Sequence, residues 1–145
     1  MKTNETEQRV YYADTDHGGV VYYSNYLRWF EIGRTELLRG TGITYNDVEN
    51  YGIHLPLIEE GVKFLKPAYY DDVLTIITKL EWLKRVRVRF TYEIWRNEEK
   101  LATGYTEHVF TDVKLRPTRP PKELQRIINK LGDTSNDIPD KRINL

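Results

Sequence analysis

The clearest pattern in the chain is an amphipathic helical stripe over residues 24–39. Its apolar members recur at i, i+4, i+7 and i+11, and charged residues fill the positions between them. The stripe consists of Tyr26, Phe30, Gly33 and Leu37, flanked by Leu27 and Leu38. Ser24 or Asn25 is suited to cap the first turn, and Gly40 to end the helix. Gly33 costs roughly 1 kcal/mol of helix propensity relative to Ala, so we expect this face to lie very close to another backbone.

Five further segments have the apolar pattern of strands. The first is predicted from Gln8 to Tyr12, and the polar residues 1–7 before it are expected to be frayed. The second is an extended segment, interrupted by Gly61 and bounded by prolines. That segment covers residues 54–67, and the other three strands are predicted over residues 73–83, 86–95 and 101–113.

Residues 73–95 cannot form one strand, because 23 residues at about 3.3 Å each would span roughly 76 Å. The chain must therefore reverse near Leu83–Arg85, although no Gly, Pro or Asn marks the turn. A clearer turn covers residues 96–100. Short helices are predicted over residues 45–49 and 122–131, and a polar tail begins at about residue 133.

Strands joined by short turns are antiparallel, and one long helix against such a sheet makes an α+β domain. We treat residues 1–145 as a single domain, because 145 residues is a usual size for one hydrophobic core. The second face of the sheet carries Tyr and Trp as well as charge, which predicts oligomerisation through the sheet or its edge. The alternative is a monomer with one wet face.

Composition narrows the function classes. The 22 basic and 22 acidic residues give zero formal charge, which argues against a general nucleic-acid or anionic-membrane binder. With no cysteine, the chain has no disulfide, thiolate metal site or cysteine nucleophile. The N-terminus has no apolar signal-like region, and no run of eighteen apolar residues occurs. We therefore expect a cytoplasmic protein without a membrane span.

Candidate chemistry is concentrated in the loop before the long helix, where Asp14 and Asp16 precede Gly18 and Gly19. Taken alone, two acids followed by glycines are typical of a solvated turn, and a calcium loop would need further acids. The three histidines, His17, His54 and His108, do not have the spacing of a metal triad, so no metal is predicted. The last two of them are expected to be structural.

The segment DTDHGGVVYYSNYLRWFEIGRTELLR resembles the signature of the hotdog-fold acyl-CoA thioesterases, in particular the 4-hydroxybenzoyl-CoA thioesterase-like group that includes a Tol-Pal-cluster thioesterase. The segment YYDDVLTI, at the third predicted strand, also matches the sequence pattern of the family. The resemblance implies a five-stranded antiparallel sheet wrapped around one long central helix. It also implies a homodimer or homotetramer with the active site at the subunit interface, and an acyl-CoA substrate with no separate cofactor.

The resemblance assigns the catalytic carboxylate to Asp16, acting as a general base for water or as a nucleophile that forms a mixed anhydride. It assigns the donor to the thioester carbonyl to the backbone N–H of Tyr23, where some relatives carry His. Asp14 is expected to bond the loop backbone, and His17 to contact the loop or the substrate. Glu31 is a minor acid candidate, and its simpler role is ion pairing with the helix arginines, Arg28 and Arg34.

Coenzyme A carries phosphates, and fork-shaped guanidinium groups match phosphate geometry. The candidates are the basic residues near the third-to-fourth strand reversal, Lys84, Arg85, Arg87 and Arg89. The alternative is a solvated charged face. Two other functions also stay open. One is a hotdog dehydratase or hydratase, whose His and helix acid have no evident counterpart here, and the other is a non-catalytic acyl-thioester-binding or scaffold protein.

Overall fold

A computed structural model describes residues 2–16 and 18–132. Five strands form one antiparallel sheet in the order β1-β3-β4-β5-β2. The strands are β1 (Thr3–Arg9), β2 (Leu57–Phe64), β3 (Val73–Lys84), β4 (Arg87–Arg96) and β5 (Glu99–Val109). The helices are α1 (Asn25–Arg39), α2 (Tyr45–Asn50), α3 (Lys122–Leu131) and the 3₁₀ turn η1 (Tyr12–Asp14). The predicted α+β architecture with a five-stranded antiparallel sheet is confirmed.

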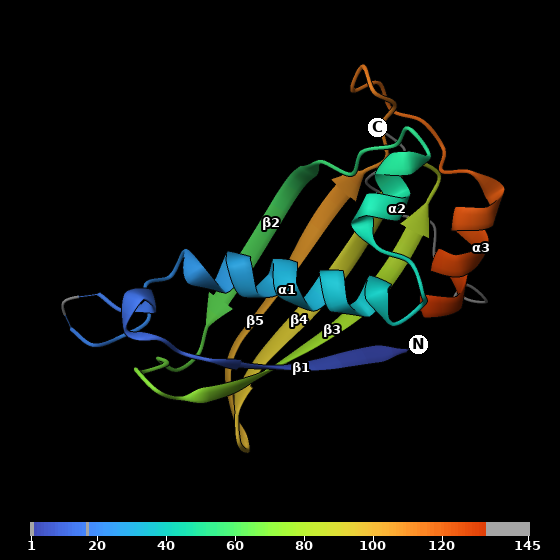
Figure 1. The fold of residues 1–145 in the computed structure, drawn as a ribbon. Coiled ribbons are helices and arrows are strands. Elements are labelled where there is room, and N and C mark those ends of the chain that lie inside the picture. The colour runs from blue at the N-terminus through green and yellow to red at the C-terminus, as the bar shows by residue number, and fades with distance from the viewer. Residues whose placement is uncertain (1, 17, 133–145) are drawn as a thin grey trace.

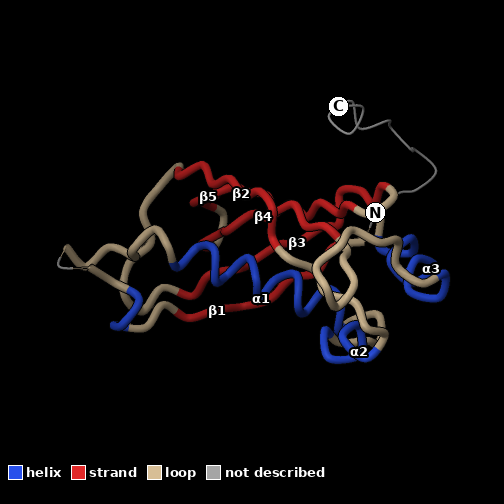
Figure 2. Tube along the Cα trace, turned by 90° about the horizontal axis from the view of Figure 1, so that it is seen from above, coloured by secondary structure: helices blue, strands red, loops and turns tan. Residues whose placement is uncertain are grey.

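Helix α1 crosses one face of the sheet, and the sheet curves so that β1 lies forward, beside the helix (Figures 1 and 2). The Phe30 ring stacks on Tyr92 of β4 at 4.3 Å between centroids. A Cβ on Gly33 would lie 2.2 Å from Thr78 Oγ1 and 3.0 Å from Ile76 Cγ2 of β3. The close approach predicted from Gly33 is therefore present, but its nearest neighbours are side chains of β3 rather than another backbone.

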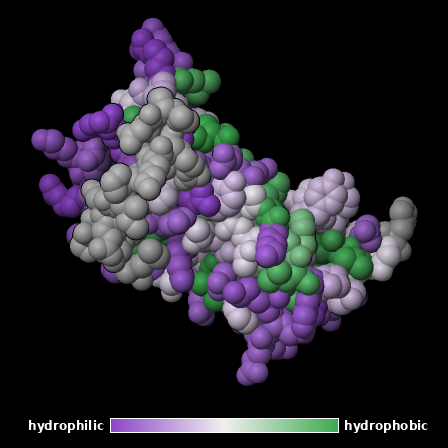
Figure 3. All heavy atoms as spheres, turned by 180° about the vertical axis from the view of Figure 1, so that it is seen from behind, coloured by the Kyte–Doolittle hydropathy of each residue, from purple (hydrophilic) through white to green (hydrophobic). Residues whose placement is uncertain are grey.

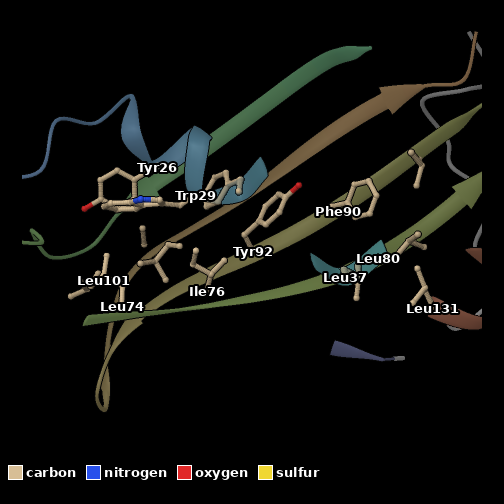
Figure 4. Close-up of a cluster of buried hydrophobic side chains, with 14 of the residues drawn as sticks. Tyr26, Trp29, Leu37, Leu74, Ile76, Leu80, Phe90, Tyr92, Leu101 and Leu131 are labelled. Atoms are coloured by element: carbon tan, nitrogen blue, oxygen red, sulfur yellow. The ribbon is translucent and has the colours of Figure 1, made fainter. Parts of the chain in front are cut away.

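The hydrophobic core lies between α1 and this face of the sheet (Figure 4). Most of its largest fully buried side chains come from α1 and from β3, β4 and β5. They include Trp29, Phe30, Leu74, Ile76, Tyr92, Ile94 and Leu101. The alternation predicted for the third and fourth strands is confirmed, because residues 74, 76, 88, 90, 92 and 94 are all buried.

The sequence prediction was wrong about the bounds of β1 and β5. The first strand was predicted from Gln8 to Tyr12, but β1 ends at Arg9 and Tyr12 begins η1. Residues 3–7 were expected to be frayed, yet they belong to β1 and pair with Ile77–Lys79 and their neighbours on β3. Backbone hydrogen bonds hold this polar strand, and its side chains alternate between exposed and half-buried. The fifth strand ends at Val109 rather than at residue 113. The predicted tail from about residue 133 lies outside the described residues.

The reversal between β3 and β4 occurs at Arg85–Val86, since Lys84 pairs with Arg87. Arg85 has a φ of 52°, so it adopts the left-handed conformation that this tight turn requires. The far face of the sheet mixes hydrophilic and hydrophobic side chains (Figure 3). On it, Arg89 is held between Glu81 and Glu107, with N–O distances of 2.7 Å to each.

Candidate active site at the start of α1

The loop between β1 and α1 is fixed against the segment that leads into β3. Val10 N donates to Asp72 O at 2.8 Å, and Val21 N donates to Ala68 O at 2.9 Å. A further bridge joins Val20 and Tyr69. These backbone contacts explain why YYDD and the acidic loop occur together, because the two segments lie side by side.

Asp14 is buried, at 6% exposure, and ties the loop to the helix. Its Oδ2 accepts from Tyr11 N at 2.9 Å, and its Oδ1 forms an ion pair with Arg28 of α1. Its backbone carbonyl accepts from Tyr22 N at 2.9 Å and from Asn25 Nδ2 at 2.8 Å. Asp14 therefore joins the loop to the first two turns of α1, and its carboxylate is fully engaged.

Asp16 has the opposite environment, because it is exposed. Its Oδ1 accepts from Gly18 N at 2.8 Å, and its backbone N–H donates to Val20 O at 2.9 Å. Within the described residues, Oδ2 has no hydrogen-bond partner. Gly19, at φ 76°, completes the turn in a conformation that suits glycine. The loop thus presents a carboxylate with one oxygen held and one free.

The first turn of α1 leaves two backbone donors available. The N–H groups of Asn25, Tyr26 and Leu27 donate to the carbonyls three residues earlier, at 3.0, 3.2 and 3.3 Å. Among the described residues, no acceptor pairs with the N–H of Tyr23 or Ser24. Ser24 occupies the N-cap position, but its side chain makes no capping hydrogen bond, contrary to prediction. Asn25 does not cap either, because its amide donates to Asp14 O.

Asp16 lies in an open hollow of about 750 Å³ at the start of α1. The hollow is lined by Tyr12, Ala13, Thr15, Asp16, Gly19, Tyr22, Ser24, Asn25 and Tyr70. The side chain of Tyr23 is 61% exposed and lines a separate hollow beside this one. The hydroxyls of Tyr22 and Tyr23 are hydrogen-bonded at 3.2 Å, and this bond raises the pKa of Tyr22.

The predicted coenzyme A contacts lie far from Asp16 within one chain. Lys84, Arg85 and Arg87 lie at the α3 end of β3, whereas the Asp16 loop adjoins its other end (Figure 1). Strand β3 has twelve residues, so eleven steps of about 3.3 Å separate its two ends by roughly 36 Å. Arg89, at 18% side-chain exposure, is engaged by two carboxylates and stacks 3.8 Å from the Tyr105 ring centroid.

The remaining candidates are dispersed. His17 lies outside the described residues. Backbone bonds with Thr111 hold His54 in place. His108 is buried, its Nε2 lies 2.9 Å from Thr106 Oγ1, and burial lowers its pKa to about 4. In the described part of the chain, no group of three or more His, Cys, Asp or Glu is placed to hold a metal ion.

Glu31 does not form the helix ion pairs expected from its spacing. Arg28 is directed to Asp14, and Arg34 hydrogen-bonds the hydroxyls of Tyr92 and Tyr45. Burial raises the pKa of Tyr45 to about 12. Glu31 remains exposed near Arg34, and it lines a hollow with Tyr45 rather than the one that holds Asp16.

Sequence reasoning missed Arg28 and the tyrosines Tyr12 and Tyr70. The two rings meet edge to face at 5.9 Å between centroids and line the Asp16 hollow. No local pattern brings residues 12 and 70 together, although the tyrosine-rich composition was a general signal for such contacts. Arg28 could be recognised only as a charged residue on the outer face of the helix.

Comparison with known proteins identifies the family. A sequence profile described as "Thioesterase-like superfamily" matches residues 10–128. The putative acyl-CoA thioesterase YneP of Bacillus subtilis is 32% identical over 113 residues, which cover 77% of this chain and 82% of the relative. The acyl-CoA thioesterase YbgC of Haemophilus influenzae is 32% identical over 125 residues, or 85% and 92% of the two chains.

Solved structures agree with the sequence relatives. The DHNA-CoA thioesterase from Staphylococcus aureus has a TM-score of 0.87 at 30% identity, covering 94% of this chain and 95% of that one. A probable thioesterase from Bartonella henselae has a TM-score of 0.78 at 33% identity, covering 83% and 100%. These matches confirm the resemblance to the hotdog thioesterases. The chain belongs to the Thioesterase-like superfamily.

Proposed function

We propose that this chain hydrolyses acyl-CoA thioesters to the free acid and coenzyme A, with Asp16 as the catalytic carboxylate and the Tyr23 N–H as the donor to the thioester carbonyl. The supporting observation is the pairing of an exposed carboxylate with unpaired helix N-terminal donors on one short segment. Negative charge is favoured at a helix N-terminus, where a tetrahedral intermediate needs stabilisation.

Two routes use these groups. As a general base, Asp16 takes a proton from water, the oxygen attacks the acyl carbon, and the C–S bond breaks to release the thiolate, which takes the proton from Asp16. As a nucleophile, Asp16 attacks the acyl carbon itself, and the C–S bond breaks to release the thiolate. Water then opens the mixed anhydride to the free acid and the Asp16 carboxylate, and its proton passes to the thiolate. In both routes the free Oδ2 of Asp16 reacts, and the Gly18 N–H holds Oδ1 in place.

The proposed enzyme is a single hotdog domain over residues 1–145, in which the sheet wraps around α1 as the central helix. It works in the cytoplasm as a homodimer or homotetramer with its site at a subunit interface. Strand β2 is an edge of the sheet and carries exposed apolar side chains, including Leu57, Ile58 and Phe64. An assembly through this edge would cover them.

Lys84, Arg85 and Arg87 are proposed to hold the phosphates of coenzyme A. Because these residues lie at the far end of β3 from Asp16 in the same chain, they can do so only in an oligomer. The basic cluster of one subunit would serve the site of another. His17, next to Asp16 in the sequence, is proposed to contact the substrate. Among the described residues, no helix is long and apolar enough to cross a membrane.

Release of free thiol from an acyl-CoA panel tests the function. Asp16→Asn is expected to lower kcat by about 10²- to 10⁴-fold, the usual contribution of a positioned acid or base. Asp71→Asn is the matched control, because Asp71 is also an exposed loop aspartate and Asn tolerates its φ of 69°. Equal turnover by Asp16→Asn and wild type would contradict the site assignment, and no thiol release from any acyl-CoA would contradict the function.

A single turnover in H₂¹⁸O tests for the nucleophilic route. If water opens an anhydride at the aspartyl carbon, ¹⁸O appears in the peptide that contains Asp16, which only the nucleophilic route explains. If water attacks an acyl carbon, either that of the thioester or that of the anhydride, ¹⁸O appears only in the released acid. Mass spectrometry of the digested protein and of the product reads both outcomes.

A further inference from the structure

A second hollow of about 300 Å³ adjoins the proposed catalytic hollow on the other side of Tyr23. Its lining is mainly apolar and consists of Val20, Val21, Tyr23, Tyr26, Phe64, Leu65, Lys66 and Pro67. Val21 and Tyr26 are buried, at 5% and 2% exposure, whereas Phe64 and Leu65 are exposed at 51% and 45%. The Tyr26 and Phe64 rings meet edge to face at 5.0 Å between centroids. The hollow therefore has a buried apolar base and open apolar walls.

Four polar groups around this hollow are already engaged. The Lys66 ammonium lies 2.9 Å from a Glu99 carboxylate oxygen. The N–H groups of Leu65 and Lys66 both donate to Leu101 O, at 2.8 and 3.1 Å. The Tyr26 hydroxyl hydrogen-bonds the backbone of Ala68. An apolar ligand would consequently meet no unpaired charge among these residues, and the unpaired Tyr23 N–H would bond the thioester carbonyl rather than the chain.

The segment from Gly19 to Ser24 forms the boundary between the two hollows. Gly19, Tyr22 and Ser24 line the Asp16 hollow, and Val20, Val21 and Tyr23 line the apolar one. The Tyr22 and Tyr23 rings are 4.5 Å apart at this boundary. A thioester carbonyl at the Tyr23 N–H would lie at the junction of the hollows. Its acyl chain could then enter the apolar hollow while its carbonyl carbon faced the Asp16 hollow.

We infer that this apolar hollow binds the straight aliphatic acyl chain of the substrate, with Leu65 and Phe64 as specificity-determining residues. The inference rests on the proposed thioesterase function. At about 30 Å³ per group of water size, 300 Å³ holds about ten such groups, so the fit is to acyl chains of short to medium length. The Asp16 hollow is less suited to such a chain, because Thr15, Asp16 and Asn25 line it.

A second copy of the chain is the competing occupant, since Phe64 and Leu65 lie at and just after the end of edge strand β2. The acyl chain is favoured because the hollow is continuous with the proposed site through Tyr23. It also lies between α1, the loop and the strand end rather than along the open strand edge. An aromatic acyl group is the other competitor, and the substrate panel distinguishes it.

The test measures kcat/KM for straight-chain acyl-CoAs from acetyl to dodecanoyl, together with benzoyl-CoA. Each buried methylene is expected to raise kcat/KM by about fourfold until the hollow is filled. Leu65→Ser should flatten this rise, and Leu65→Trp should move the optimum to shorter chains. Leu115→Ser is the matched control, because Leu115 is 66% exposed in the turn after β5, lines neither hollow, and should keep the wild-type chain-length dependence.

The outcomes separate this inference from the function on which it rests. Thiol release that is independent of chain length, that is fastest with benzoyl-CoA, or that keeps its chain-length profile in both Leu65 variants would overturn the inference alone. A changed oligomeric size in Leu65→Ser, measured by light scattering, with an unchanged chain-length profile would assign the hollow to a second copy. Absence of thiol release from every substrate would overturn the proposed function and the inference together.

Discussion

Breaking the ion pair between Asp14 and Arg28 should weaken both folding and catalysis, because this pair joins the Asp16 loop to α1. In Asp14→Ala, the Tyr11 N–H loses its acceptor and Arg28 loses its partner. In Arg28→Ala, a carboxylate at 8% side-chain exposure keeps only the bond from Tyr11. The backbone bonds from Tyr22 and Asn25 to the Asp14 carbonyl persist in both variants, so the loop should be displaced rather than unfolded.

The expected energies follow from burial. A hydrogen bond to a charged group contributes about 1.5–3 kcal/mol, and a buried N–H without an acceptor costs about 1–3 kcal/mol. The Arg28 side chain is 46% exposed, so solvent screens its charge and lowers the energy of the ion pair toward that of a surface pair. We therefore expect Asp14→Ala to lower the free energy of unfolding by about 2–3 kcal/mol and Arg28→Ala by about 1–2 kcal/mol. Their coupling energy in a double-mutant cycle should be about 1 kcal/mol.

Urea unfolding of the two single variants and the double variant gives the coupling energy, and thiol release gives kcat and KM. A displacement of the Asp16 carboxylate by about 1 Å is expected to lower kcat by up to about 10²-fold, with a smaller change in KM. The Arg28→Lys variant should restore part of both losses, because it retains a cation. Additive stability effects, together with wild-type kcat in Arg28→Ala, would refute the positioning role.

Two further predictions concern the core. His108 has a pKa of about 4 in the folded protein and about 6.5 in the unfolded chain, so the unfolded chain binds more protons between these pH values. The free energy of unfolding should therefore fall by about 3 kcal/mol as the pH drops from 6.5 to 4. Urea titrations of His108→Gln should show no such dependence on pH. Gly33→Ala should destabilise the fold by about 1–3 kcal/mol, although alanine has the better helix propensity, because the new Cβ would lie 2.2 Å from Thr78 Oγ1. Thermal melting of this variant and of the control Gly40→Ala tests the prediction.

Sequence patterns predict best those helices and strands that bury one face against the core. The stripe containing Phe30 and Leu37 predicted α1, and alternation predicted β3 and β4, because burial imposes a period on each. Strand β1 has no apolar alternation and was placed too late in the chain, at Gln8–Tyr12 instead of Thr3–Arg9, since its order comes from backbone pairing with β3. The end of β5 was also misplaced, because the apolar residues Phe110 and Val113 continue the pattern beyond Val109, whereas the chain there has only isolated bridges at Thr111.

Within the candidate site, local chemistry was predictable and long-range pairing was not. The turn of Asp16 follows from its neighbours, as Gly18 donates to it two residues away. The partner of Asp14 lies fourteen residues away, so helix spacing pointed instead to Glu31 as the partner of Arg28. The basic residues after β3 were expected near coenzyme A, but their separation from Asp16 depends on strand direction, which a linear cluster does not reveal.

The start of α1 departs from the usual helix-capping rule, and it does so at the proposed active site. A capping serine at position 24 would direct its hydroxyl to the first turn and satisfy a helix donor. Ser24 makes no such bond, and among the described residues the N–H groups of Tyr23 and Ser24 have no acceptor. Leaving them unpaired beside an exposed carboxylate forgoes about 1 kcal/mol of capping energy. The same arrangement keeps two donors available for the developing oxyanion of a thioester, so the departure from the capping rule lies where the proposed chemistry requires it.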